Sequence, residues 1–381
     1  MKLVSLKYSE NFGQNQEWIL NKLTLGNKNL IVGRNSAGKT RTLSVIGSLA
    51  RALYSPQFTM NRSCHYYCEW LNVDDVSYIY EYTINDGLVV FERLTIGGQE
   101  KIERREIGVG SIFYEDLNGG QFLAFKVPEG ELAIKRRDAL QHPFLEPLHQ
   151  WASEVRHYYF GSPFGKEHMA VFGPNMPSVD EKDPSQTVGL LRNAIRSFGK
   201  KFLNLVLSDM QSLGYNLEIL ELGFPVSIDP MLVPPGLNCI RVKERGVKGY
   251  VDQVTMSQGM YRVLALLINI NYLMFKKTST CVIIDDIGEG LDFERSCELI
   301  SLLRKKADVS NIQIIMSTND KFVMNEVPLS EWTVLSRDGG EVHVSNYSNS
   351  KQKFDDFKFT GLSNFSFFEM DYLRCSESGD D

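Results

Sequence analysis

The sequence predicts an α/β fold with a mixed β-sheet core, a β-rich N-terminal lobe and an inserted helical lobe. Residues 29–40 hold a short apolar run and then a glycine-rich loop, and a helical pattern of apolar residues follows them. Two further apolar runs, residues 281–284 and 312–316, each end in polar side chains. Between these segments, residues 76–83 and 88–94 have the composition of short strands. Strands that alternate with helices in this way are typical of an α/β core.

Composition and charge limit the classes of function. Of the 381 residues, 43% are hydrophobic and 23% are charged, which is ordinary for a globular protein. The 41 basic and 47 acidic residues give a formal net charge of −6, which does not support DNA as a partner. The N-terminus lacks a signal-peptide core, and the apolar run at residues 263–270 is far shorter than a membrane span. We therefore expect a cytoplasmic protein with no membrane partner.

Residues 33–40 read Gly-Arg-Asn-Ser-Ala-Gly-Lys-Thr, the pattern of a phosphate-binding P-loop. Its glycines let the chain turn tightly, so that backbone N–H groups face an anion, and the following helix adds a partial positive charge. We expect Lys39 to reach the β- and γ-phosphates of a nucleotide and Thr40 to ligate Mg²⁺. The predicted nucleotide contacts are Gly33, Arg34, Asn35, Ser36, Ala37, Gly38, Lys39 and Thr40.

Residues 281–292 read Cys-Val-Ile-Ile-Asp-Asp-Ile-Gly-Glu-Gly-Leu-Asp, an apolar strand that ends in paired carboxylates. This arrangement is typical of a Walker B segment. The first carboxylate of such a segment holds Mg²⁺, usually through water, and the next acidic residue polarises the attacking water. Asp285 is therefore the predicted metal ligand and Asp286 the predicted catalytic base.

Two more segments carry polar side chains suited to phosphate. Residues 312–316 deliver the run Ser-Thr-Asn-Asp to the same edge of a parallel sheet, where Asn319 can read the γ-phosphate. Residues 256–262 read Met-Ser-Gln-Gly-Met-Tyr-Arg and precede an apolar helix at residues 263–274. A serine and a glycine at a helix start make another anion site, here with Ser257 and Gly259.

Along the chain the motifs follow in the order P-loop, signature, Walker B with D-loop, and switch, and in this order they resemble the ABC-type ATPases. The branch in question includes the SMC, RecF and OLD (overcoming lysogenisation defect) proteins and the related AAA-type ATPases of bacterial anti-phage systems. The Walker B and D-loop pattern of the family is Asp-Glu-x-x-x-x-Leu-Asp. Asp285, Asp286 and Asp292 keep its register. The fold class is thus expected to be a P-loop NTPase of the ABC-ATPase type.

The other two motifs match less closely. The family signature, Leu-Ser-Gly-Gly-Gln, resembles residues 256–260, which keep Ser257 and Gly259 but have Met260 in place of the glutamine. The family switch segment, Thr-His-Asp, resembles residues 318–320. Asn319 replaces the histidine there and keeps a hydrogen-bond donor for the γ-phosphate.

The resemblance implies ATP and Mg²⁺ as cofactors and a head-to-tail homodimer or higher homo-oligomer. ATP on one P-loop would be capped by Ser257 and Gly259 of the other subunit, and Asp292 would link the two sites. Such a dimer is a switch for a separate effector protein, and a nuclease or toxin of an anti-phage defence system is our first interpretation. The alternative is a RecF- or SMC-like DNA-repair ATPase that binds DNA on the closed dimer. A transporter subunit is disfavoured, whereas the substitutions at Asp286 and Asn319 keep open a regulatory module that binds ATP without hydrolysing it.

Hydrolysis is expected to be slow. Asp286 stands where the family has glutamate, so its carboxylate is one methylene shorter and holds the lytic water less well. Glu289 is either a substitute catalytic base or a residue that only makes a dimer contact, and we favour the second interpretation.

Four segments describe the expected domain organisation. Apolar residues recur at steps of three and four over residues 188–205, which favours one amphipathic helix packed on its own domain over a dimerisation zipper. The aromatic stretch at residues 354–372 is either a docking segment for the effector or a segment packed on its own core. The tail has no acidic cluster of the kind that metal-dependent cleavage needs, so the effector is expected on another chain. The segments are residues 1–160 (P-loop and β-rich lobe), 161–250 (inserted lid and helices), 251–345 (signature, Walker B, D-loop and switch) and 346–381 (tail).

Overall fold

The central strands of the fold are parallel and buried on both faces. The structure, a computed structural model, describes residues 1–56, 63–115, 120–173 and 178–375. In β15 and β16 every residue is buried, as expected for a parallel sheet that is covered by helices. Parallel pairing joins β15 to β16, β16 to β3 and β3 to β17, so the carboxyl ends of these strands lie at one edge. The central strands are β3 (Lys28–Gly33), β10 (Arg156–Tyr159), β15 (Thr280–Asp285), β16 (Ile312–Ser317) and β17 (Trp332–Asp338).

An antiparallel part extends this sheet on the side of the N-terminus. In β4, buried residues alternate with half-buried ones, because only one of its faces packs on the core. The strand-like runs predicted at residues 76–83 and 88–94 are confirmed as β5 and β6. The strands are β1 (Lys2–Glu10), β2 (Trp18–Thr24), β4 (Cys64–Leu71), β5 (Ser77–Asn85), β6 (Leu88–Ile96), β7 (Gln99–Glu106), β8 (Val109–Tyr114), β9 (Gln121–Lys126) and β18 (Glu341–Asn346).

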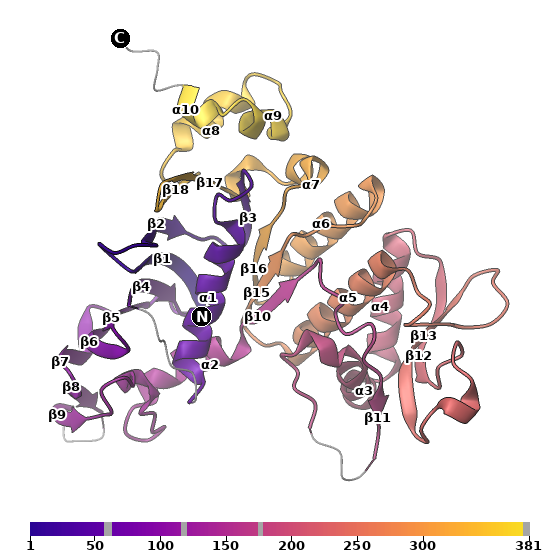
Figure 1. Cartoon of the computed structure of the whole chain (residues 1–381), viewed down its shortest axis with the longest axis horizontal. Coiled ribbons are helices and arrows are strands. Elements are labelled where there is room, and N and C mark those ends of the chain that lie inside the picture. Colours follow the sequence, from indigo (N-terminus) through magenta and orange to yellow (C-terminus); the bar gives the residue numbers. More distant parts are fainter. Residues whose placement is uncertain (57–62, 116–119, 174–177, 376–381) are drawn as a thin grey trace.

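Together these strands form, within the described residues, one 14-stranded sheet in the order β10-β15-β16-β3-β17-β18-β2-β1-β4-β5-β6-β7-β8-β9. Helices α1 (Lys39–Tyr54) and α2 (Glu146–Glu154) lie beside it (Figure 1). Trp151 of α2 meets Trp70 of β4 edge to face, with 5.2 Å between ring centroids. The mixed parallel and antiparallel β-sheet predicted from the sequence is therefore present.

A second group of elements lies beside the sheet in Figure 1. It contains the long apolar helix α5 (Gln258–Lys276) and a small sheet in which β13 pairs with β11, β12 and β14. Its other elements are β11 (Ala170–Val171), α3 (Thr187–Phe198), α4 (Lys200–Ser212), β12 (Leu217–Gly223), β13 (Leu237–Glu244) and β14 (Val251–Asp252). Short 3-10 turns occur at Ala133–Lys135, Pro143–Leu145, Pro184–Gln186, Pro230–Leu232 and Leu329–Glu331.

The prediction of one helix over residues 188–205 is wrong, because the chain breaks at Gly199. That glycine has φ +62°, and it ends α3 and begins α4. The apolar spacing continues on both sides of the break, so periodicity alone does not reveal it. Only glycine adopts this left-handed conformation at little cost.

A buried polar cluster joins three helices near the motifs. Asp209 of α4 forms an ion pair of 2.7 Å with Lys306 of α6 (Phe293–Asp308). Asn271 of α5 donates to the Asp209 carboxylate over 2.6 Å and accepts from Lys306 over 2.8 Å. Each buried charge is thus paired and hydrogen-bonded, which is what makes its burial tolerable. The cluster ties α5, which begins within the signature run, to α6, which follows the D-loop.

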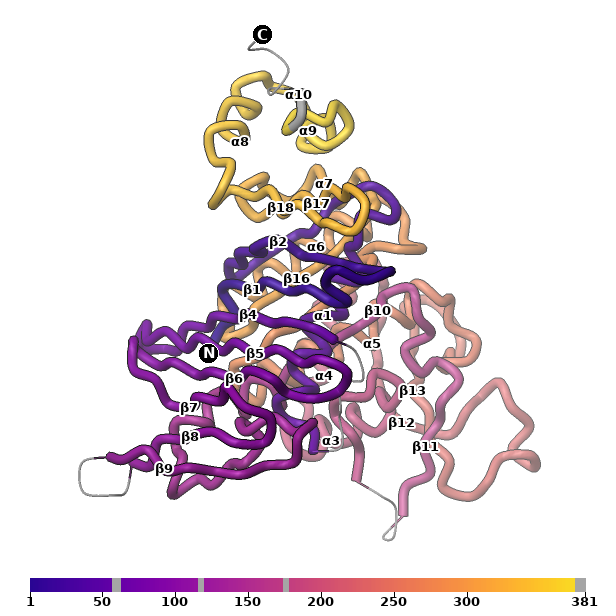
Figure 2. Tube along the Cα trace, turned by 60° about the vertical axis from the view of Figure 1, so that its left-hand side comes forward, coloured from indigo at the N-terminus to yellow at the C-terminus, as the bar shows by residue number. Residues whose placement is uncertain are grey.

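The last described residues form short helices that lie near β17 and β18 in both views (Figures 1 and 2). Phe354, Phe357 and Phe367 are buried there. For these residues of the 354–372 stretch, packing on the chain's own core is correct, whereas Phe359 is 89% exposed. These C-terminal helices are α8 (Lys351–Lys358), α9 (Asn364–Glu369) and α10 (Tyr372–Cys375), whereas α7 (Lys321–Glu326) lies between β16 and β17. Of the helices described, none has the length and apolar content needed to cross a bilayer.

Candidate nucleotide site

The P-loop connects β3 to α1 through two left-handed residues. Ser36 has φ +67° and Gly38 has φ +100°, which turns the backbone back toward the start of α1. Gly33 is needed for another reason: a Cβ at this position would lie 2.8 Å from the carbonyl oxygen of Leu335 in β17. The strand, loop and helix predicted around residues 33–40 are confirmed.

Ser36 adopts a conformation that costs a non-glycine residue about 1–2 kcal/mol. We expect Ser36→Gly to raise the free energy of unfolding by about 0.5–1 kcal/mol, because the relief of strain exceeds the added entropy of the unfolded chain. Urea denaturation measures this. Ser44→Gly inside α1 is the matched control and should lower the same quantity by about 0.5 kcal/mol. A loss of stability in Ser36→Gly would contradict the strain argument.

Lys39 lies in the first turn of α1 with its side chain buried against the loop. Its Nζ donates to the carbonyl oxygen of Gly33 over 2.8 Å and to that of Arg34 over 3.4 Å. Burial lowers the pKa of the Lys39 amine, and the carboxylates of Asp286 and Asp285 act in the opposite direction. Lys39 therefore lies close enough to both Walker B carboxylates for their charges to act on its amine.

Ser317 at the end of β16 holds both Walker B carboxylate residues in place. Its hydroxyl donates to the Asp285 carboxylate, and its Oγ accepts from the backbone N–H of Asp286 over 3.0 Å. Asp285 is 3% exposed, whereas Asp286 is half-buried and has φ +52°. Burial raises the pKa of Asp286, Asp285 and Glu289 raise it further, and Lys39 opposes them. A raised pKa suits a group that accepts a proton from water.

The switch segment brings Asn319 to the carboxylate of Asp286. Its Nδ2 donates to Asp286 Oδ1 over 3.5 Å, and its side chain is otherwise exposed. Thr318 anchors the segment by donating to the carbonyl oxygen of Ile287 over 3.1 Å. P-loop, Walker B and switch residues thus form one cluster, and their catalytic roles remain predictions.

The signature residues lie instead against the D-loop of the same chain. Ser257 is the N-cap of α5, where its Oγ accepts from the backbone N–H of Met260 over 3.2 Å. A Cβ at Gly259 would lie 3.1 Å from Leu291 Cδ2 and 3.2 Å from the carbonyl oxygen of Gly290. This close packing accounts for the glycine within a single chain.

Asp292 has a similar local role as the N-cap of α6. Its carboxylate accepts from the backbone N–H of Arg295 over 3.0 Å and pairs with the Arg295 side chain. These contacts, the backbone hydrogen bond first, lower the pKa of Asp292. The link between nucleotide sites that we expect from Asp292 remains a prediction.

The D-loop is joined to two other segments by Arg262, a residue to which sequence analysis assigned no role. Its guanidinium donates to the carbonyl oxygens of Gly161, of Ser162 over 3.0 Å and of Glu289 over 3.3 Å. A Cβ at Gly161 would overlap the Glu289 carboxylate. Arg262 closes the signature run in the sequence, but its partners lie in distant segments. Both interpretations of Glu289, substitute base and dimer contact, stay open.

The residues predicted to hold Mg²⁺ have suitable chemistry. Thr40 is exposed in the first turn of α1 and directly follows Lys39, which interacts with Asp285. A hydroxyl and a carboxylate are the oxygen ligands that Mg²⁺ accepts when phosphate and water complete its shell. Within the described ranges, no group of three or more His, Cys, Asp and Glu side chains is arranged to hold a metal ion by itself. Thr40 and Asp285 therefore fit a metal that arrives with a nucleotide.

Comparison with known proteins shows the fold. No protein-family model matches the sequence, and no curated protein matches it. Among solved structures, the chain is similar to an SMC head bound to the C-winged helix domain of ScpA, with 13% identity, 92% of this chain and 99% of that chain covered, and a TM-score of 0.55. An SMC head with an extended coiled coil, bound to the C-terminal domain of ScpA and derived from Pyrococcus furiosus, gives 11% identity, 93% and 99% coverage, and a TM-score of 0.52. The chain therefore has the α/β fold of SMC heads.

Proposed function

We propose that this protein is an ATP-driven switch in which two copies close head to tail around ATP and hydrolyse it slowly. The observation that carries the proposal is the separation of the motifs into two clusters. One contains Lys39, Asp286 and Asn319, and the other contains Ser257 and Gly259 packed on the D-loop. Two copies would supply each ATP with one cluster from each chain.

The residues of the first cluster have distinct tasks in this proposal. Lys39 and the P-loop amides bind the phosphates, while Thr40 and Asp285 hold Mg²⁺, which when bound offsets the phosphate charge. Asp286 accepts a proton from the attacking water, and Asn319, which already donates to Asp286, orients that water or the γ-phosphate. Ser317 positions both aspartates through its hydroxyl, which contacts the Asp285 carboxylate and the backbone N–H of Asp286.

Slow turnover is supported by the geometry of Asp286. Its short side chain starts from a backbone with φ +52°, and its hydrogen bond with Asn319 is long, at 3.5 Å. A base that is not held at an ideal distance from water contributes less to the rate. The switch would then stay closed for long periods between turnovers.

Two exposed aromatic side chains support closure with a second copy. Phe293 directly follows Asp292, and Phe322 lies two residues after Asp320. They are 54% and 37% exposed, and their rings meet edge to face at 4.6 Å. An exposed aromatic pair beside both the D-loop and the switch is the kind of surface that a partner covers.

The proposed output is control of a separate effector, a nuclease or toxin, in an anti-phage defence system. The family resemblance of the motifs supports this part. A solved SMC head of similar fold carries a separate protein, ScpA, which supports a partner on a domain of this shape. DNA binding on the closed dimer is not favoured, because the net charge is −6.

The test is the oligomeric state with and without ATP, measured by light scattering on the Asp286→Asn protein so that ATP persists. We expect ATP to convert monomers into dimers. Adding Ser257→Arg should abolish dimers without weakening ATP binding, because Ser257 would meet the nucleotide of the other subunit. Ser153→Arg in α2 is the matched control and should still dimerise. Monomers at saturating ATP in the Asp286→Asn protein would overturn the proposal.

A further inference from the structure

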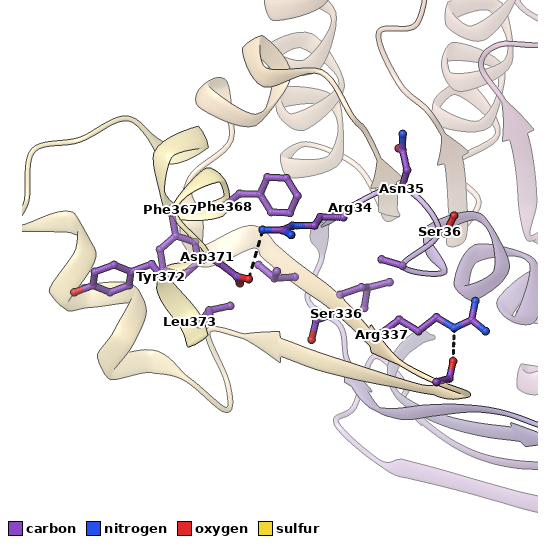
Figure 3. Close-up of a pocket in the computed structure, with 14 residues that line it drawn as sticks. Arg34, Asn35, Ser36, Ser336, Arg337, Phe367, Phe368, Asp371, Tyr372 and Leu373 are labelled. Atoms are coloured by element: carbon purple, nitrogen blue, oxygen red, sulfur yellow. Dashed lines mark hydrogen bonds and ion pairs between the residues drawn. The ribbon is translucent and has the colours of Figure 1, made fainter. Parts of the chain in front are cut away.

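A cavity of about 420 Å³ lies on the outer side of the P-loop, between that loop and the C-terminal helices (Figure 3). Its walls come from residues 34–37 of the P-loop, residues 334–337 of β17, and residues 367–373 at the end of α9 and the start of α10. Lys39 and Thr40 are not among its lining residues. The cavity thus shares residues 34–37 with the predicted nucleotide contacts, but it lacks the lysine and the hydroxyl that finish a phosphate site.

The walls combine apolar surface with positive charge. Leu335 and Phe367 are buried and form part of the apolar lining, and Figure 3 shows the Phe368 ring beside the Arg34 side chain. Arg34 lies 3.6 Å from the Asp371 carboxylate. Arg337 donates its Nε to the carbonyl oxygen of Gly339 over 2.8 Å, and in the part of the chain that is described no salt bridge joins it to a carboxylate. The charged residues of the lining are thus two arginines and one aspartate.

We propose that this cavity is a second ligand site, which binds a small aromatic anion. The volume lies in the range of small-molecule sites and accommodates a fused ring system with one anionic group. Aromatic side chains and the planar guanidinium of Arg34 stack on a ring, and Arg337 supplies the charge that an anionic group needs. Asp371 is already matched by Arg34, so the surplus charge is positive. A cation or a purely aliphatic ligand fits this lining less well.

The experiment is a fluorescence titration of the full chain with 8-anilinonaphthalene-1-sulfonate, an aromatic anion. N-phenyl-1-naphthylamine, which lacks the sulfonate, is the neutral comparison. We expect one saturable site for the sulfonate and binding at least about tenfold weaker for the neutral compound, the loss of one charge-assisted contact. Equal affinity for the two compounds would overturn the proposal.

Variants locate the site. Arg337→Glu reverses an exposed charge of the lining and should weaken sulfonate binding about tenfold or more, and Phe368→Ala should weaken it as well. Arg105→Glu, an exposed arginine on β7, is the matched control and should bind like the unchanged protein. Lys39→Ala should also leave sulfonate binding intact. Melting temperatures within a few degrees of the unchanged protein establish that each variant is folded.

Two outcomes would overturn the inference. One is unchanged sulfonate affinity in both Arg337→Glu and Phe368→Ala. The other is strict competition between ADP and the sulfonate, since the cavity would then belong to the nucleotide site. The readout does not require ATP or dimerisation, so failure of the proposed switch would leave this result standing. Failure of the cavity proposal would likewise leave the proposed switch untouched.

Discussion

Lys39→Ala should remove nearly all ATPase activity, with a loss of about 10²–10³-fold or more in kcat/KM. The amine is buried, donates to two P-loop carbonyls and interacts with both Walker B carboxylates, so its charge is placed where phosphates would lie. Removing one preorganised donor from such a site costs about this much. Phosphate release measures hydrolysis, and equilibrium binding of a fluorescent ATP analogue measures the accompanying loss of affinity.

Lys200→Ala is the matched control for Lys39→Ala. Lys200 is exposed in the first turn of α4 and takes part in none of the motifs. Its replacement should leave both measurements within twofold of the unchanged protein. Activity of Lys39→Ala near the unchanged level would show that phosphate is bound elsewhere and that the P-loop assignment is wrong.

Asp286→Asn should lower the rate of ATP hydrolysis by about 10²–10⁴-fold while ATP still binds, because an amide cannot accept the proton of the attacking water. The pH dependence gives a second signature. Burial raises the pKa of Asp286, and only its unprotonated form acts as base. Acidification should therefore lower kcat/KM at a higher pH than for an aspartate with an ordinary pKa, and this acid limb should vanish in Asp286→Asn.

Glu289→Gln separates the two interpretations of the D-loop carboxylate. If Asp286 is the base, the Glu289→Gln protein should hydrolyse bound ATP at nearly the unchanged rate, and the main effect should be weaker dimerisation. Normal hydrolysis in Asp286→Asn together with loss in Glu289→Gln would transfer the role of base to Glu289. Asp286→Glu restores the residue found in the family and is expected to raise the rate.

Much of the candidate site could be predicted because its signals are local. A P-loop needs glycine and Lys-Thr at fixed spacing, and a buried strand such as β15 reveals itself as a run of apolar residues before its carboxylates. Ser257 and Asp292 are N-caps, a role that depends on the next three residues of the chain. In each case the physical cause lies within a few positions along the backbone.

Contacts between distant segments could not be predicted in this way. Arg262 donates to Ser162, which is 100 positions away along the chain, and nothing near either residue indicates the pairing. The contact between Gly161 and Glu289 depends on how the loop after β10 meets the D-loop. Such pairings depend on the register and packing of the whole sheet.

The sequence by itself therefore determined the nucleotide motifs, their order and the α/β class. Only the tertiary structure decided that the chain breaks at Gly199, that Phe367 is buried in the C-terminal helices, and that Ser317 holds both Walker B carboxylates. It also decided that the outer face of the P-loop borders a cavity. The physical reason is that motifs follow from local backbone geometry, whereas burial and cavities arise where segments remote in sequence pack together.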